Sequence, residues 1–228
     1  MKCIAIIPAR GGSKRIPRKN IKDFLGKPII AYSIQVALES KIFDEVMVST
    51  DDVEIAGIAK QFGAAVPFLR TNKNADDFAS TIDVVAEVID NYERLGKKFE
   101  FGCCIYPTAP FVMVERIQKG YELLVNKKYD TVFPITRFSY PIWRALQVVD
   151  NKTNMIWPEN MTKRSQDLPP AFHDAGQWYW FKISKIFSNK KLWTENTFGL
   201  EISETEVQDI DNDSDWQIAE MKFKLLFK

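Results

Sequence analysis

Short apolar runs and longer stretches with helical spacing alternate along this chain. Each run is short enough to be a buried strand and is followed by a segment whose apolar residues recur every three or four positions. Strands are predicted at residues 3–7, 45–49, 101–106, 131–136, 177–183 and 198–202. This order is typical of a three-layer α/β fold, in which a mostly parallel sheet carries helices on both faces.

The predicted helices also carry start and stop signals. Asp52 is positioned to cap a helix that Gly63 ends, and either Asp213 or Ser214 to cap the last helix. Helices are predicted from Pro28 onward and at residues 53–62, 81–96, 115–126 and 214–227. The residues expected to face the core are Ile30, Ile34 and Leu38 in the first helix and Trp216, Ile218, Ala219 and Phe223 in the last.

Residues 137–173 break this alternation. They hold four prolines, several aromatic residues and a possible short strand at residues 146–149. Because exposed aromatic side chains need a surface to cover them, we expect an insertion that folds onto the main domain or onto a second subunit. A long, partly ordered loop is the alternative. We therefore expect residues 1–228 to form one domain, with residues 137–173 contributing to a homodimer and to part of a ligand pocket.

Composition and charge narrow the class of protein. The 228 residues are 46% hydrophobic, and 31 basic residues nearly balance 30 acidic ones, for a net charge of +1. Such a balance gives no global reason to bind nucleic acid or an anionic membrane, and no apolar run is long enough to span one. Cys103 and Cys104 are adjacent in a predicted strand and would point to opposite faces, so a disulfide framework is not expected. We expect a cytoplasmic protein.

Candidate chemistry concentrates in the loop after the first predicted strand, residues 9–20. Paired glycines let a backbone approach a phosphate, and the loop's five Arg and Lys side chains can neutralise its charge. The spacing matches neither a P-loop nor the dinucleotide-binding G-x-G-x-x-G turn. Ligands of open α/β sheets nevertheless bind beyond the carboxyl ends of the strands, where this loop begins. The alternative is a solvated basic loop.

Residues 7–14, continued by residues 17–21 and 25–28, resemble the signature loop of the CMP-sialic acid synthetases, cytidylyltransferases of nine-carbon keto-sugar acids. The resemblance implies that this loop holds the triphosphate of CTP. It extends to Arg70, to Ser80 and Thr81, and to residues 106–110, where Tyr106 replaces a family glutamine. The nucleotide-binding residues it implies are Ala9, Arg10, Gly11, Ser13, Lys19, Asn20, Arg70, Ser80, Thr81 and Thr108.

Further segments resemble the family's sugar-binding side. Residues 163–169 are similar to its Arg-rich Gln-Asp-Leu-Pro stretch, and residues 174–181 resemble the branch that acts on pseudaminic acid. Alternating aromatic residues in the second segment also fit the two faces of a buried strand. Arg144 and Arg164 are candidates to pair with a sugar carboxylate, because a guanidinium can bind a carboxylate through two hydrogen bonds. The expected sugar-binding residues are Tyr106, Arg144, Arg164, Gln166 and Tyr179.

Two carboxylates, Asp209 and Asp211, stand two residues apart near the carboxyl end. In an extended segment both lie on one face, and such a pair suits Mg²⁺, or Mn²⁺ in its place. The resemblance supports this, because the family places metal-binding aspartates in a matching Asp-x-Asp segment. The acidic residues from Asp209 onward also have the spacing of an EF-hand calcium-binding loop. Ser214, however, stands where that loop requires a glycine for its turn.

The resemblance implies transfer of CMP from CTP to the anomeric hydroxyl of a nonulosonic acid, with pseudaminic acid as the expected substrate. Arg10 and Lys19 would stabilise the departing pyrophosphate, and Asp209 and Asp211 would hold the cation; these four are the expected catalytic residues. The proton acceptor is left open between a metal-bound hydroxide and a carboxylate. Alternatives are synthetases for N-acetylneuraminic, legionaminic or eight-carbon (KDO-type) acids, and a nucleotide-binding module without catalysis.

Overall fold

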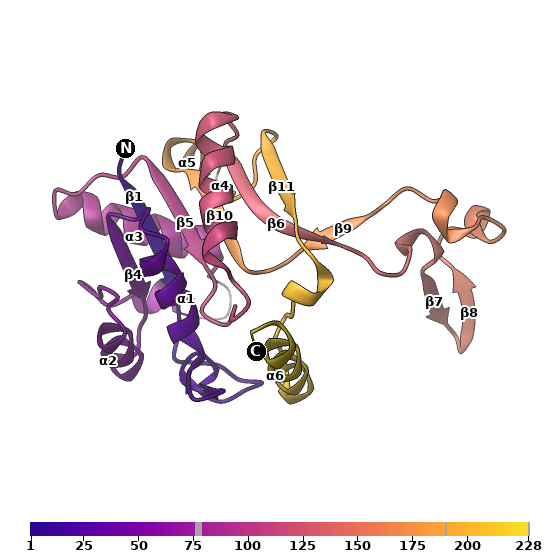
Figure 1. The fold of residues 1–228 in the computed structure, drawn as a ribbon, viewed down its shortest axis with the longest axis horizontal. Coiled ribbons are helices and arrows are strands. Elements are labelled where there is room, and N and C mark those ends of the chain that lie inside the picture. The colour runs from indigo at the N-terminus through magenta and orange to yellow at the C-terminus, as the bar shows by residue number, and fades with distance from the viewer. Residues whose placement is uncertain (76–78, 190, 228) are drawn as a thin grey trace.

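A sheet of seven strands forms the centre of the molecule in a computed structural model that describes residues 1–75, 79–189 and 191–227 (Figure 1). The strand order is β11-β6-β10-β5-β1-β4, and β9 pairs with β6. The strands are β1 (Cys3–Pro8), β4 (Glu45–Ser49), β5 (Phe101–Ile105), β6 (Thr131–Arg137), β9 (Phe172–Asp174), β10 (Trp178–Lys182) and β11 (Thr197–Glu201). All six strands expected from the apolar runs are therefore present, within one or two residues of the predicted ends.

The strand directions bring several chain segments to one edge of the sheet. β1 runs parallel to β4 and β5, and β11 runs parallel to β6, whereas β10 is antiparallel to both β5 and β6. The predicted mostly parallel sheet is confirmed, with β9 and β10 as its reversed strands. The carboxyl ends of β1, β4, β5 and β6 and the amino end of β10 consequently lie at the same edge, where ligands of such sheets bind.

Helices cover both faces of the sheet, as expected. α1, α2 and α4 pack on the face that receives Ala5 and Ile7 of β1, while α3 and α5 pack on the face that receives Ile4 and Ile6. Cys103 and Cys104 likewise point to opposite faces, and all three cysteines are buried and free. The helices are α1 (Ile29–Glu39), α2 (Val53–Gln61), α3 (Thr81–Arg94), α4 (Val114–Asn126), α5 (Ile183–Asn189) and α6 (Asp213–Leu226).

The last helix, α6, lies below the sheet in a separate apolar cluster (Figure 1). Its Trp216 packs edge-on against Phe24 of the short strand β2 (Asp23–Phe24), which pairs with β3 (Lys27–Pro28). The expected cap was wrong: Asn212, not Asp213 or Ser214, accepts a hydrogen bond from the Asp215 amide, and the Asp215 side chain completes a capping box. No helix among the described residues is long and apolar enough to cross a membrane.

Two residues expected in the core are exposed. Leu38, near the end of α1, is 41% exposed, and Ile218 of α6 is 40% exposed. Helical spacing groups residues on one side of a helix, but the width of the element that covers the helix decides how many of them are buried. Ile30 and Ile34 of α1 and Trp216 of α6 are buried as expected.

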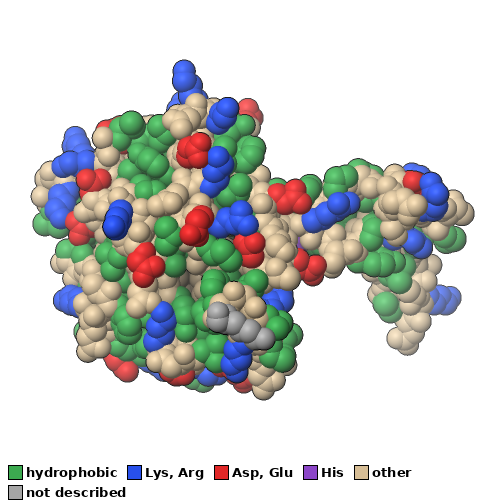
Figure 2. Space-filling view, viewed as in Figure 1, with side chains coloured by type: hydrophobic (Ala, Val, Ile, Leu, Met, Phe, Trp, Pro, Cys, Tyr) green, Lys and Arg blue, Asp and Glu red, His purple; other side chains and the backbone are tan. Residues whose placement is uncertain are grey.

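The segment from residue 138 to residue 171 forms an arm that projects from the body. It carries a hairpin of β7 (Leu146–Val149) and β8 (Lys152–Met155), and it leaves and rejoins the body through β6 and β9. In the space-filling view the arm is a lobe on a narrow neck, with hydrophobic side chains along its lower side (Figure 2). All four residues of β7 are exposed, so the arm has a surface that this chain does not cover.

Candidate active site

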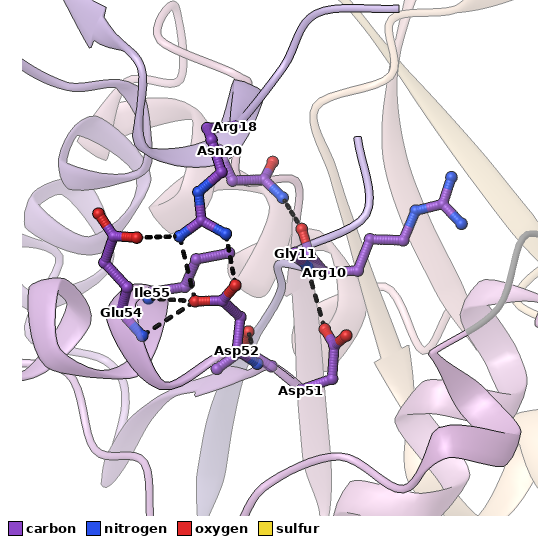
Figure 3. A network of polar contacts seen from close by, with 9 residues as sticks. Arg10, Gly11, Arg18, Asn20, Asp51, Asp52, Glu54 and Ile55 are labelled. Carbon is purple, nitrogen blue, oxygen red and sulfur yellow. Dashed lines mark hydrogen bonds and ion pairs between the residues drawn. The ribbon is translucent and has the colours of Figure 1, made fainter. Parts of the chain in front are cut away.

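The glycine-rich loop after β1 is tied down at both of its ends (Figure 3). The Gly11 amide donates a hydrogen bond to Asp51 Oδ1 at 3.0 Å, and Asn20 Nδ2 donates to the Arg10 carbonyl at 2.9 Å. Ala9 extends the strand pairing by donating its amide to the Ser49 carbonyl at 2.9 Å. The loop is therefore a built structure at the carboxyl end of β1, not a loose basic segment.

Arg18 turns from the loop toward the start of α2. Its backbone is in the left-handed region, with φ at 55°, and its guanidinium bonds both carboxylate oxygens of Asp52 and Glu54 Oε2, the latter at 2.5 Å. Asp52 also caps α2, accepting from the Glu54 and Ile55 amides at 2.9 and 3.0 Å. Hydrogen bonds from Arg18 and from these amides lower the pKa of Asp52 to about 2.

Lys19 joins the loop to the predicted metal-binding segment. Its Nζ donates to the Ile210 carbonyl at 2.6 Å and lies 3.8 Å from Asp211 Oδ1, which Arg15 also approaches at 2.7 Å. Burial lowers the pKa of Lys19, while the charges of Asp211 and Asp209 act in the opposite direction. The structure thus brings together the basic loop and the Asp209–Asp211 pair, which are far apart in sequence.

Both aspartates point away from the core because the residue between them is anchored in it. Ile210 is 1% exposed and packs in the cluster with α6, so its two neighbours project from the other side of the extended chain. Lys222 Nζ of α6 donates a hydrogen bond to the Val207 carbonyl at 2.8 Å, which fixes the backbone just before this segment. Mg²⁺ prefers oxygen ligands and is usually bound by one or two protein carboxylates. Two carboxylates that point away from the core fit this requirement.

No third acidic, histidine or cysteine side chain joins these aspartates as a metal-binding group in the described part of the chain. The donor set is therefore too small to enclose a cation. Mg²⁺ normally fills its remaining coordination positions with water and phosphate oxygens, so a site of two carboxylates is open for a nucleotide.

A cavity of about 500 Å³ lies next to Asp209, at the edge where β5 and β6 end. Tyr106, His173 and Asp174 line it. Behind this wall, Tyr179 Oη donates to Asp174 Oδ2 at 2.5 Å, and the Tyr106 and Tyr179 rings pack with centroids 5.4 Å apart. Burial raises the pKa of Tyr179, so its phenol stays protonated and acts as a donor. The cavity therefore offers a fixed polar wall.

The other residues expected to bind the nucleotide occupy varied positions. Arg70 is buried and donates from Nε to Ser49 Oγ at 3.0 Å, which fixes the end of β4. Ser80 caps α3 through a capping box with Asp83, and Thr81 Oγ1 lies 3.3 Å from Tyr106 Oη. Thr108 and Ser13 are half-buried. The hydrogen bonds of Arg70 and Ser80 thus organise the backbone around the site.

The structure does not bring the other sugar-binding candidates to this cavity. Arg164 forms two hydrogen bonds with Asp167, at 2.7 and 3.0 Å, inside the arm. Gln166 lines a different cavity, of about 430 Å³, at the neck of the arm. Arg144 also lies in the arm, and its Nε is buried without a hydrogen-bond partner among the described residues. Arg144 and Arg164 therefore do not line the cavity beside Asp209, whereas the cavity that Gln166 lines adjoins it and shares Thr136 and Glu204 with it.

Sequence reasoning assigned Asp52 only to helix capping and gave Asp51 and Arg18 no specific partners. The signal that was present is the acidic pair directly after the second parallel strand. Adjacent parallel strands end at the same edge, so an acidic turn after β4 must lie beside the basic loop after β1. That placement brings the acidic turn close to the loop, but it does not determine which of the loop's five cations pairs with Asp52.

Comparison with known proteins identifies the family of this chain. A family model described as cytidylyltransferase matches residues 4–219. The chain is 41% identical to a pseudaminic acid cytidylyltransferase of Campylobacter jejuni, over 99% of this chain and 97% of the relative. It is 34% identical to a CMP-N,N'-diacetyllegionaminic acid synthase of Legionella pneumophila, with the same coverage.

A solved structure has the same fold at low sequence identity. The structure of CMP:2-keto-3-deoxy-manno-octonic acid synthetase complexed with CTP superposes with a TM-score of 0.74 at 16% identity, covering 99% of both chains. That likeness bears on the fold alone, whereas the family match spans nearly the whole sequence. This chain therefore belongs to the cytidylyltransferase family and is a nucleotidyltransferase.

Proposed function

We propose that this enzyme transfers CMP from CTP to the anomeric hydroxyl of pseudaminic acid, releasing pyrophosphate. The observation that carries the proposal is the contact between the basic loop and the acidic segment, made by Lys19 at Ile210 and Asp211. It brings cationic side chains and two carboxylates to one edge of the sheet, beside a cavity large enough for a sugar. The 41% identical relatives named for pseudaminic acid support this substrate over the alternatives.

The reaction forms one bond and breaks one at the α-phosphorus of CTP. The anomeric oxygen attacks in line, the bond to the β-phosphate oxygen breaks, and the hydroxyl proton leaves to a base. Arg10 and Lys19 are placed on the loop to neutralise the leaving pyrophosphate, and the loop glycines let backbone amides approach it. The enzyme's part is alignment and charge neutralisation, with no covalent intermediate on the protein.

Cytidylyltransferases of this kind generally use a divalent metal ion, and we propose Mg²⁺ at Asp209 and Asp211. When bound, such an ion neutralises phosphate charge and fixes the geometry of the triphosphate. Arg15 and Lys19 pair with Asp211 in the structure, so these cations neutralise the carboxylate. We also propose that the enzyme acts in the cytoplasm, which suits its three free cysteines.

The arm is proposed to form a homodimer and to complete the partner's sugar site. Its exposed apolar residues include Tyr140, Leu146, Val148 and Val149, which need a covering surface. The Arg144 Nε, buried without an acceptor among the described residues, is the kind of group that a second chain or a carboxylate ligand would satisfy. Arg144 and Arg164 would then serve the cavity of the other subunit, while Gln166 lines a cavity that adjoins the one in its own chain.

The test of the reaction is pyrophosphate release from each of the four common nucleoside triphosphates, with Mg²⁺ and pseudaminic acid. We expect release with CTP only, and a product whose mass is that of CMP joined to the sugar. Legionaminic acid is the second candidate acceptor, favoured by the 34% identical relative. CTP binding without release with either acid would instead support a nucleotide-binding module.

A further inference from the structure

The Arg18 side chain points in a different direction from that of Arg10 in the same glycine-rich loop. In Figure 3 the Arg10 side chain extends away from Asp51 and Asp52, whereas Arg18 reaches back to Asp52 and Glu54. Arg18 is therefore occupied by two carboxylates of its own chain. A guanidinium held in this way is poorly placed to bind a phosphate as well.

The geometry around Asp52 leaves little room for the loop to move. Asp52 accepts from the Arg18 guanidinium through both oxygens and from the Glu54 and Ile55 amides through Oδ1. A Cβ atom on Gly11 would lie 2.7 Å from Asp52 Oδ2, so the loop backbone passes close over this carboxylate. The loop and the start of α2 are thus in contact at Gly11 as well as at Arg18.

The Arg18 backbone also requires an anchor. Its φ of 55° is in the left-handed region, which is unfavourable for a residue with a side chain. The next residues are Lys19, which reaches the Ile210 carbonyl, and Asn20, which closes the loop on Arg10. The conformation of Arg18 therefore sets the direction in which Lys19 leaves the loop.

We propose that Arg18 and Asp52 form a clamp that positions the loop, and Lys19 in particular, for the triphosphate. The clamp acts through the loop without touching the nucleotide, so both are positioning residues. The inference rests on the proposed binding of CTP by this loop. It removes Arg18 from the set of direct phosphate ligands and gives the acidic turn after β4 a role in nucleotide affinity.

The test compares Arg18→Leu, Asp52→Asn and the double variant with the wild type. Asparagine is as good a helix cap as aspartate, so Asp52→Asn keeps the start of α2 but places an amide donor against the guanidinium. The measured quantities are the CTP dissociation constant by calorimetry, the KM for the sugar and the thermal midpoint. Glu54→Gln is the matched control, because it removes a charge from the exposed side of the same guanidinium.

Each single variant is expected to weaken CTP binding by about tenfold, with the sugar KM little changed. Asp52→Asn should also lower the thermal midpoint at neutral pH, because it removes the carboxylate that pairs with Arg18. The double variant should be no weaker than either single one, because both break the same unit. Glu54→Gln should stay within about twofold of the wild type. Arg18→Lys should recover part of the affinity.

Two results would overturn the proposal. A loss for Arg18→Leu without a loss for Asp52→Asn would make Arg18 a direct phosphate ligand. Lower thermal midpoints with unchanged CTP affinity would make the clamp purely structural. Because the readout is CTP binding, a wild-type protein that binds CTP but transfers no CMP would refute the proposed function and still test the clamp.

Discussion

The Asp52 carboxylate stabilises two elements at once, the amino end of α2 and the loop that carries Arg18. Its capping role could be predicted from the local sequence, because capping depends on residues two and three positions ahead. Its pairing with Arg18 could not, because the two are 34 residues apart and meet only when β4 pairs with β1. The same limit applies to Lys19 and Ile210, which meet across 191 residues.

The depressed pKa of Asp52 predicts an acid dependence of stability. The folded pKa is about 2 and the ordinary value is 3.8, so ionised Asp52 stabilises the fold above about pH 4, and this contribution is lost as the pH falls toward 2. The free energy of unfolding of the wild type minus that of Asp52→Asn should therefore shrink over this range in urea titrations. A difference that stays constant between about pH 5 and pH 2.5 would contradict the assigned partners.

If Asp209 and Asp211 hold the cation, alanine at Asp211 should lower CMP transfer far more than alanine at the nearby Asp213. Asp211→Ala should lower CMP transfer by about a hundredfold or more, because it removes a proposed cation ligand. Asp213→Ala is the matched control: Asp213 is 78% exposed, pairs with Lys22 and starts α6. Pyrophosphate release at saturating Mg²⁺ measures both, and similar rates for the two variants would remove Asp211 from the site.

At the scale of elements, periodicity predicted where helices and strands lie better than which residues they bury. The strand β4 and the ends of α4 were predicted within one residue, whereas Leu38 and Ile218 were expected in the core and are exposed. The spacing of apolar residues is a property of one element, but burial depends on the partner that covers it. The short helix α5 was missed because its few residues directly extend the apolar run of β10.

Alanine substitutions at two helical glycines should change the stability of the fold in opposite directions. A Cβ atom on Gly120 of α4 would lie 2.6 Å from the buried Trp178 ring, whereas one on Gly57 of α2 would meet nothing within 4 Å. Gly120→Ala should therefore destabilise the fold by about 1–3 kcal/mol through overpacking. Gly57→Ala should stabilise it by up to about 1 kcal/mol through helix propensity.

Denaturant titration of the two alanine variants measures both effects. The wild type and each variant should share the same denaturant slope, which would show that the compactness of the unfolded state is unchanged. A stabilising Gly120→Ala would mean that α4 does not pack as closely on β10 as the structure has it.

At the scale of the whole molecule, the alternation of strands and helices was sufficient to predict a three-layer α/β fold. The shape of residues 137–173 was not predictable, because a proline-rich segment with scattered aromatics has no single periodicity. In the structure it projects as an arm (Figure 1), and neither Arg144 nor Arg164 lines the cavity beside Asp209. A sugar role for these residues therefore requires a second subunit.

The exposed apolar surface of the arm predicts a homodimer. A charged residue introduced into the β7–β8 hairpin should weaken the association of the two chains. Light scattering should give twice the chain mass of 26.3 kDa for the wild type. Val148→Glu, at a β7 residue that is 69% exposed, should shift the mass toward the monomer because it buries an unpaired charge in the interface. Val53→Glu, at a residue of the body that is 76% exposed, should leave the mass unchanged. A monomeric wild type at micromolar concentration would contradict the proposed dimer.

The identity of the acceptor sugar is the central claim, and a side-by-side measurement of kcat/KM tests it most directly. Pseudaminic, legionaminic and N-acetylneuraminic acids are each supplied with CTP and Mg²⁺, and pyrophosphate release is followed. The cavity bounded by Tyr106, Asp174 and Asp209 is expected to favour pseudaminic acid by at least about a hundredfold. A higher kcat/KM for either of the other two acids would contradict the claim.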